Sequence, residues 1–427
     1  MAGRGVLRLT LRTALVVVVT VVLGFVAFLG AAWLTSTPVL VLAAGLLTLA
    51  AGVLLGGRRL RAGPRRHRPA GRGGTVAAAV AALLVLAFAL TAVLPAGPGR
   101  PAAAVPGERF WPLPAGSQLR YTLTPARGRA RPEPVIFLHG GPGTPDLAGD
   151  TAYFGQLAAD GFDVYVYDQF GSGGSSRADD PTAYGVDRDV GDLEAIRQLI
   201  GADRLILIGH SYGAVVAAGY LAGYPQHVAR VVFSSPASLD PADRSAANVT
   251  GRLGGSRLLR LYGRLGRPRN LLVYGLLQVD PSAAHRLAGD AEMDGRNDAV
   301  YAVTEAALHC AGQGEPHPPT GTGFYRLQYP QSATAPSTAD LRPALTGNPT
   351  PALVIKGSCD YLSWSSAVTY LQAFPDSHLM YLHGGHNSYQ DTPGPYLSTM
   401  RAFLTGAALP VPALPTTSVP AGYEGAP

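Results

Sequence analysis

The sequence predicts an α/β protein: a mostly parallel sheet with helices on both faces, an inserted helical cap, and three transmembrane helices ahead of it. Strand-like and helix-like segments alternate over residues 109–238 and 350–406, which is typical of a parallel sheet. Residues 239–349 are rich in Arg and Leu and then in Gly and Pro, and they interrupt this alternation as an inserted cap would. Residues 1–95 contain three long apolar runs, which predict a membrane region.

The three apolar runs cover residues 14–34, 38–56 and 75–94. A helix rises about 1.5 Å per residue, so about 20 residues cross a hydrocarbon core of about 30 Å. A cleaved signal peptide is a poorer explanation, because its apolar region is shorter and occurs once. Core helices buried in a soluble protein are the other alternative. We expect membrane spans.

The distribution of arginine predicts the orientation of these spans. Three arginines precede the first run and seven lie between the second and third, whereas the turn at 35–37 has none. Positively charged loops stay in the cytoplasm. We therefore expect a multi-pass membrane protein with its N-terminus inside and the residues after 95 outside. If the third run does not span, the body of the protein is cytoplasmic instead.

The basic charge of the chain belongs to this N-terminal region. Residues 1–100 contain eleven Arg and no other charged residue, so the remaining residues hold 23 of the 34 basic groups and all 28 acidic groups. A mildly acidic body does not favour nucleic acid as a partner. The composition, 47% hydrophobic and 15% charged, also excludes a disordered chain.

Two flanking segments have compositions that do not form a core. Residues 96–108 are a Pro/Gly/Ala linker, and the Pro-rich residues 407–427 are expected to form a disordered tail. Between these flanks, short apolar segments predict the strands of the sheet. They are residues 134–138, 162–167, 204–209, 230–234, 352–356 and 378–382.

The segment Gly209-His210-Ser211-Tyr212-Gly213 has the pattern G-x-S-x-G. Between a strand and a helix, this pattern forces the serine into a tight elbow and exposes its hydroxyl, which makes Ser211 a candidate nucleophile. The pattern alone is weak evidence in a chain with 53 Gly. Its position after an apolar strand and before an Ala-rich segment strengthens it.

A second glycine-rich segment, His139-Gly140-Gly141-Pro142-Gly143, directly follows the first buried strand. Glycines allow backbone N–H groups to approach a substrate oxygen, which is what an oxyanion hole requires. We expect the N–H groups of Gly141 and Tyr212 to be its two donors. A glycine-rich turn without catalytic function is the alternative.

An acid and a histidine follow the last two strands, where side chains at the carboxyl edge of a parallel sheet can converge. Asp360 lies just after strand 352–356, and His386 lies just after strand 378–382. With Ser211 they would form a nucleophile, acid and base. His383 and Asp391 are competing candidates nearby.

Several of these motifs together resemble the proline iminopeptidase family of α/β-hydrolases. The resemblance rests on HGGPG, on Asp168–Ser175 (DQFGSGGS), on Asp192-Leu193-Glu194 with Arg197, and on GHSYGA. It covers about residues 115–240 and 350–405. It implies that Ser211, Asp360 and His386 are nucleophile, acid and base, with Asp168 and Gln169 in a structural turn beside the site. It also implies release of an N-terminal residue, often proline, from peptides, without a metal or cofactor.

The sequence departs from this family in two places. Phe170 stands where the family turn usually has Arg, and the cluster with which the family's cap holds a free amino terminus is not recognisable. Glu305, in a helical and partly apolar stretch, is the candidate for substrate binding. A solvated cap surface explains most of the cap carboxylates equally well.

Cys310 and Cys359 are the only cysteines, one in the cap and one beside Asp360. Outside the cell, pairing of cysteines is favoured, so we expect a disulfide between cap and core. Two buried free thiols are the alternative.

Three functions are consistent with the sequence. The first is a membrane-anchored serine hydrolase of the aminopeptidase type that acts on a small peptide. The second keeps the same three residues but acts on a small ester, lipid or amide, because the fold does not set the substrate. The third is a non-catalytic binding protein. The expected partners are a small substrate and the lipid bilayer; the oligomeric state is not predicted.

Overall fold

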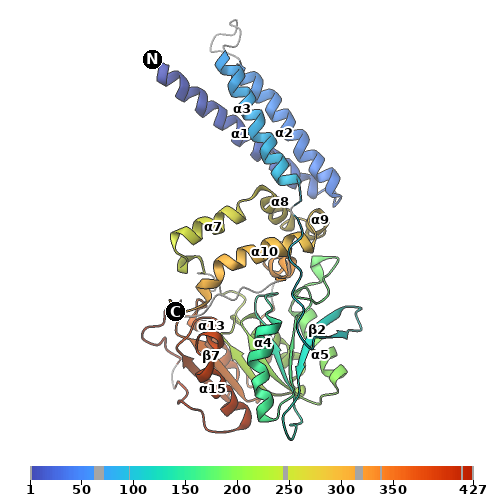
Figure 1. The fold of residues 1–427 in the computed structure, drawn as a ribbon, viewed down its shortest axis with the longest axis vertical. Helices are drawn as coiled ribbons and strands as arrows, with labels where there is room; N and C mark the ends of the chain where they lie inside the picture. Colours follow the sequence, from blue (N-terminus) through green and yellow to red (C-terminus); the bar gives the residue numbers. More distant parts are fainter. Residues whose placement is uncertain are drawn as a thin grey trace. The chain divides into compact units, whose positions relative to one another are not determined.

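The computed structural model describes residues 2–61, 72–95, 97–243, 249–312, 321–336, 339–414 and 417–425. Two compact units divide the chain. The first unit comprises residues 1–97, 262–292 and 332–334, and the second comprises the remaining residues. Figure 1 shows the order of the elements, and each unit is described by itself below.

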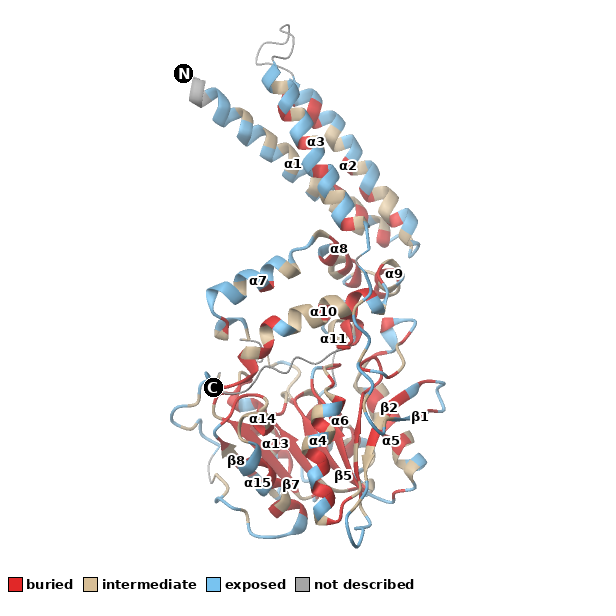
Figure 2. Cartoon of the chain, in the orientation of Figure 1, coloured by how far each residue is buried: buried red, intermediate tan, exposed pale blue. Residues whose placement is uncertain are grey.

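The first unit is built on three helices, α1 (Ala2–Ala32), α2 (Pro38–Arg61) and α3 (Arg72–Val93). By length and composition, all three are able to cross a membrane. Their surfaces are largely exposed (Figure 2), as expected for side chains that face lipid. Gly56 of α2 allows close packing on α1, because a Cβ there would lie 2.3 Å from the Val16 side chain. Small residues serve the same purpose at helix contacts within membranes.

Two short helices of the first unit come from the segment expected to be the cap. They are α8 (Pro268–Leu277) and α9 (Pro281–Leu287), which pack against the long helices. Arg269 of α8 is buried and pairs with Glu292, and its Nη1 donates to the carbonyl oxygen of Val93 at 2.9 Å. Arg269 therefore fixes α8 to the end of α3 through the Val93 carbonyl, and its charge is balanced by Glu292.

The second unit contains an eight-stranded sheet in the order β1-β2-β4-β3-β5-β6-β7-β8. β2 pairs antiparallel with β1 and β4, and the other pairs are parallel, which confirms the predicted mostly parallel sheet. The strands are β1 (Arg109–Pro112), β2 (Gln118–Thr124), β3 (Val135–Leu138), β4 (Val164–Tyr167), β5 (Leu205–His210), β6 (Val228–Ser234), β7 (Ala352–Gly357) and β8 (Ser377–Leu382).

Helices cover both faces of the sheet, which explains why the central strands are mostly apolar. One face packs against α4 (Leu147–Phe154) and α15 (Pro393–Thr405), and Figure 2 shows the strands beneath as buried. α5 (Val186–Ile200) and α6 (Tyr212–Gly223) pack together, with α6 against β3, β5 and β6, and α13 (Trp364–Ala373) packs against β7 and β8.

The described part of the segment between β6 and β7 contains helices joined by loops. Besides α8 and α9 it contains α7 (Gly255–Leu265), α10 (Asp290–Thr304), α11 (Phe324–Gln328) and α12 (Arg342–Leu345). From Met293 onward its described residues belong to the second unit, except residues 332–334, which belong to the first. α14 (Ser388–Asp391) follows β8.

The sequence did not predict β1 and β2. It also predicted a disordered tail at residues 407–427. The two missed strands are amphipathic, and their pairing is antiparallel rather than part of the strand–helix alternation. The tail has no helix or strand among its described residues, yet it contacts the second unit. Trp364 Nε1 donates to the Thr417 carbonyl at 2.7 Å, and the Glu424 N–H donates to the Ser358 carbonyl at 2.9 Å.

Candidate active site

Ser211 occupies a sharp turn between β5 and α6. Its backbone has φ 54° and ψ −114°, a conformation that non-glycine residues rarely adopt. The turn requires a close approach of α6 to β3, since a Cβ on Gly213 would lie 2.1 Å from the Leu138 carbonyl oxygen. Gly213 is therefore required for the packing of α6 on β3. The strained Ser211 stands at the N-terminus of α6.

Ser211 and His386 line the same cavity, which has a volume of about 180 Å³. The loop after β3 contributes Gly140 and Gly141 to its wall, and residues of the inserted segment contribute Tyr301 and Glu305. The structure thus brings together the candidate nucleophile, the candidate base, one candidate oxyanion donor and the candidate substrate-binding residue.

Asp360 and His386 form a buried pair beside this cavity. His386 Nδ1 donates to Asp360 Oδ1 at 2.9 Å, and Lys356 Nζ donates to Asp360 Oδ2 at 2.8 Å. Burial alone would raise the pKa of Asp360, but Lys356 and His386 hold it below its ordinary value. An ionised Asp360 fixes the Nδ1–H tautomer of His386, which leaves Nε2 able to accept a proton.

The two competing candidates have other partners. His383 is exposed, and its Nδ1 lies 3.2 Å from Ser358 Oγ. Asp391 accepts from His309 Nδ1 at 2.6 Å and from the Gly385 N–H at 2.6 Å. The structure therefore pairs Asp360, rather than Asp391, with His386.

The HGGPG loop approaches Ser211 closely. A Cβ on Gly140 would lie 3.0 Å from Ser211 Cβ. Gly141 has φ 119°, and a Cβ there would lie 2.6 Å from the Gly143 nitrogen, so only glycine fits. Tyr212, the other candidate donor, is the first residue of α6, where backbone N–H groups lack partners within the helix.

The turn that contains Asp168 is hydrogen-bonded to the HGGPG loop. Gln169 N–H donates to His139 Nε2 at 3.0 Å, and its side-chain amide donates to the His139 carbonyl at 2.8 Å. Burial lowers the pKa of His139 to about 4, so the imidazole is neutral and able to accept. Asp168 and Gln169 therefore have a visible structural role.

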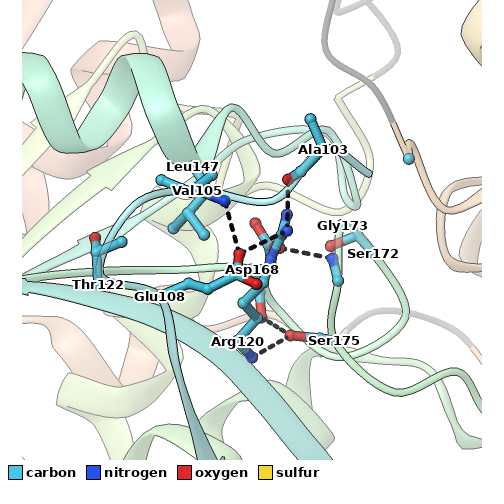
Figure 3. Close-up of polar contacts among 12 residues, drawn as sticks. Ala103, Val105, Glu108, Arg120, Thr122, Leu147, Asp168, Ser172, Gly173 and Ser175 are labelled. Atoms are coloured by element: carbon cyan, nitrogen blue, oxygen red, sulfur yellow. Dashed lines mark hydrogen bonds and ion pairs between the residues drawn. The ribbon is translucent and has the colours of Figure 1, made fainter. Parts of the chain in front are cut away.

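Arg120 of β2 holds this turn (Figure 3). Its Nε donates to Asp168 Oδ2 at 2.7 Å, and its Nη1 donates to the Ala103 carbonyl at 2.8 Å. Ser175 Oγ donates to the Asp168 carbonyl at 2.6 Å and accepts from the Arg120 N–H at 2.8 Å. Figure 3 shows these groups converging with Glu108, so part of the expected linker is fixed to the site's scaffold.

A second buried pair, which sequence reasoning missed, lies beside Tyr212. Arg326 of α11 pairs with Asp189 of α5, and Tyr212 Oη donates to the same carboxylate at 2.7 Å. Both charged side chains are buried. Burial raises the pKa of Asp189, and Arg326 opposes that rise. No local motif links these residues, because they are far apart in sequence and meet only in the folded chain.

The inserted segment is tied to the loop of His386 through His309. His309 Nδ1 donates to Asp391 Oδ1 at 2.6 Å, and its Nε2 donates to Glu305 Oε1 at 3.3 Å. Burial opposes its protonation, but hydrogen bonds to Asp391 and Glu305 raise the pKa of His309 to about 9. Glu305 thus faces both the cavity and an imidazolium.

Cys310 and Cys359 form a disulfide in the structure, with their Cα atoms 5.3 Å apart. The described residues contain one cluster with metal-ligand geometry, Cys310, Cys359 and His383. Because both sulfurs are in the disulfide, neither is available as a thiolate ligand. The bond instead connects the segment that carries Glu305 and His309 to the residue before Asp360.

Comparisons with known proteins agree with this architecture. A family model described as alpha/beta hydrolase fold matches residues 133–393. The chain is similar to proline iminopeptidases: it is 45% identical over 105 residues to one from Heyndrickxia coagulans, covering 24% of this chain and 35% of the relative. It is 35% identical over 130 residues to one from Saccharolobus solfataricus, covering 30% of this chain and 40% of the relative. The matches thus span little more than a third of these curated relatives.

A crystal structure of a proline iminopeptidase from Mycobacterium smegmatis superimposes with a TM-score of 0.47 at 21% sequence identity, covering 70% of this chain and 98% of that chain. An esterase from Exiguobacterium antarcticum gives 0.46 at 17% identity, covering 69% and 98%.

Proposed function

The chain belongs to the α/β-hydrolase fold family, and from this premise we propose that it is a membrane-anchored serine hydrolase that releases N-terminal residues, proline among them, from small peptides. The observation that carries the proposal is the buried Asp360–His386 pair, whose histidine lines the same cavity as the strained Ser211.

The proposed reaction follows from these positions. His386 takes the Ser211 proton as the serine oxygen attacks the scissile carbonyl, and the Asp360 carboxylate stabilises the imidazolium that forms. The N–H groups of Gly141 and Tyr212 stabilise the oxyanion. His386 then protonates the leaving amine, and water hydrolyses the acyl-enzyme by the same steps.

The cavity supports a small substrate with a positive charge. At about 180 Å³ it is smaller than the pockets of about 300–1,000 Å³ that hold drug-sized ligands. Glu305, Asp146 and Asp150 line it, and burial raises the pKa of Asp150 well above its ordinary value. Asp146 and Glu305, which also accepts from His309, are the proposed acceptors for a protonated α-amino group. This argument favours an aminopeptidase over an esterase or amidase of the same fold.

The membrane part of the proposal rests on α1–α3, whose length and apolar composition suit three spans. With positive loops in the cytoplasm, the second unit lies outside. The disulfide supports this orientation, since disulfides persist in oxidising compartments. Protease accessibility of residues 100–427 in intact cells tests it, and full protection would contradict the outside orientation.

The activity is tested with the full chain in detergent. Initial rates are measured on prolyl-, alanyl- and leucyl-anilides, on their N-acetylated forms, and on a short-chain aryl ester. We expect anilide cleavage that requires a free amine, and its loss by at least about 10³-fold in Ser211→Ala and His386→Gln. His383→Gln is the matched control, because His383 is exposed and outside the cavity wall.

Each other outcome is informative. Turnover of the ester alone would favour the esterase alternative. Equal rates in the Ser211→Ala variant would refute the nucleophile assignment. No turnover of any of these substrates by the wild type would favour the binding protein.

A further inference from the structure

Lys356 is the only lysine in a chain with 34 basic residues, and the structure buries it completely. It lies near the end of β7, four residues before Asp360. Its Nζ donates to Asp360 Oδ2 at 2.8 Å, to the Leu362 carbonyl at 3.3 Å and to Ser366 Oγ at 3.4 Å. An ammonium group has three N–H donors, and here each has an acceptor.

A buried ammonium group at this position of the strand is not explained by packing alone. The preceding residues of β7, 352–355, are apolar and fully buried, and an apolar side chain would continue that pattern. Burying a charge is unfavourable unless it is paired, and apolar replacements of buried ion pairs are often neutral or stabilising. Lys356 is therefore better explained by what it does to Asp360 than by its contribution to the core.

Two side chains donate hydrogen bonds to the Asp360 carboxylate, one to each oxygen. One carboxylate oxygen accepts from Lys356 and the other accepts from His386. A proton gained by His386 Nε2 creates a second positive charge on the same carboxylate. The Lys356 charge opposes that protonation, because like charges close together disfavour one another.

We propose that Lys356 is a positioning residue that orients the Asp360 carboxylate and, through its charge, lowers the basicity of His386. The catalytic consequence rests on the function proposed above, whereas the electrostatic coupling of Lys356 to His386 does not.

Among the described residues, the other titratable groups in contact with His386 and Lys356 carry no positive charge. His210 packs against His386 with ring centroids 4.9 Å apart, but burial and then His386 lower the pKa of His210 to about 3. The rings of Tyr361, against His386, and Tyr423, near Lys356, have pKa values that burial raises, so both are neutral. Burial lowers the pKa of Lys356, and Asp360 together with Asp243, which accepts from Ser363 Oγ, opposes that fall.

Two substitutions separate charge from hydrogen bonding. Lys356→Met removes both, and Lys356→Gln removes the charge but keeps N–H donors. The acid limb of the kcat/KM profile should move to higher pH by about one unit in both variants, which is about a tenfold loss of rate on that limb. KM should change little. Ser366→Ala is the control, because it removes one acceptor of Lys356 and no charge.

If Lys356→Gln has the pH profile of the wild type and only Lys356→Met loses activity, the proposed charge effect is wrong and the role of Lys356 is structural. A shifted profile in the Ser366→Ala control would also contradict it.

A second measurement needs neither a variant of Lys356 nor catalysis. Lysine labelled with ¹⁵N at Nζ gives a single side-chain resonance in the full chain, because only one lysine exists. We expect an ammonium signal at pH 7 that shifts as His386 titrates, and that loses this transition in His386→Gln. A neutral amine at pH 7, or the same transition in His386→Gln, would overturn the inference. Since Ser211 takes no part, failure of the proposed hydrolase activity leaves this test intact.

Discussion

Removing the disulfide should cost the second unit about 4 kcal/mol of unfolding free energy. Cys310 and Cys359 are separated by 49 positions. In the chain-entropy description, a closed loop of about 50 residues removes about 14 cal/mol/K from the unfolded state, or about 4 kcal/mol at 25 °C. Both cysteines are buried, so the perturbation chosen is Cys310→Ala with Cys359→Ala, which introduces no polar group.

The same substitution should affect activity much less than stability. Asp391 still accepts from the Cys310 and Gly385 N–H groups, and the Cys359 N–H still donates to the Gly384 carbonyl at 2.8 Å. These bonds hold the loops of the acid and the histidine without the sulfur bridge. We expect kcat/KM to stay within about threefold at 25 °C, since the pair that reacts is not displaced.

The assay is urea unfolding of the full chain in detergent, followed by intrinsic fluorescence, with and without a reductant. The double variant should have a lower midpoint and an unchanged slope, and the reductant should have no further effect on it. Intact-mass analysis before and after alkylation verifies the bond in the wild type. A free energy of unfolding within about 1 kcal/mol of the wild type would refute the entropic reasoning.

Two further predictions concern buried charges. The folded-state pKa of His309 is raised to about 9, so its ion pairs with Asp391 and Glu305 contribute stability that is complete below about pH 6.5 and is lost as the pH rises through about 9. Thermal unfolding between pH 6 and 10 should show this loss. A His309→Gln variant whose stability depends on pH in the same way would contradict it. Replacing Arg326 by Met should destabilise the second unit by about 3–5 kcal/mol, because it leaves the Asp189 carboxylate buried without its cation. Denaturant unfolding of Arg326→Met, Asp189→Asn and the double variant checks this, and strictly additive losses would show that the two do not interact.

The fold was predictable because its signals are local. The central strands are continuous apolar runs, and helices begin shortly after them, so the pattern of a covered parallel sheet is visible in the residues themselves. The comparison with the family and the observed pairing confirm that prediction. The sequence did not predict β1 and β2. β1 is a short edge strand, and β2 alternates polar and apolar side chains, so both have a weaker pattern than a continuous apolar strand.

The candidate site was partly predictable for the same reason. Ser211 and Gly141 stand in segments whose glycines are required by contacts within a few residues or by a neighbouring strand. Asp360 and His386 follow successive strands, and the carboxyl ends of parallel strands meet at one edge. The pairing of Arg326 with Asp189 depends on the path of the inserted segment, which no short pattern specifies. Lys356 could have been singled out as the only lysine, but its partner is visible only in three dimensions.

The structure also suggests why the site is surrounded by buried ion pairs. Its loops must present backbone N–H groups, a strained serine and a histidine to substrate, so they are rich in glycine and have few apolar side chains with which to pack. Buried cations fix these loops instead: Arg120 at the Asp168 turn, Arg326 beside Tyr212, His309 at the loop of His386, and Lys356 at Asp360. Buried pairs contribute little net stability compared with apolar packing, but breaking one is strongly unfavourable. Each cation thus penalises displacement of its loop, which is the property that a preorganised active site requires.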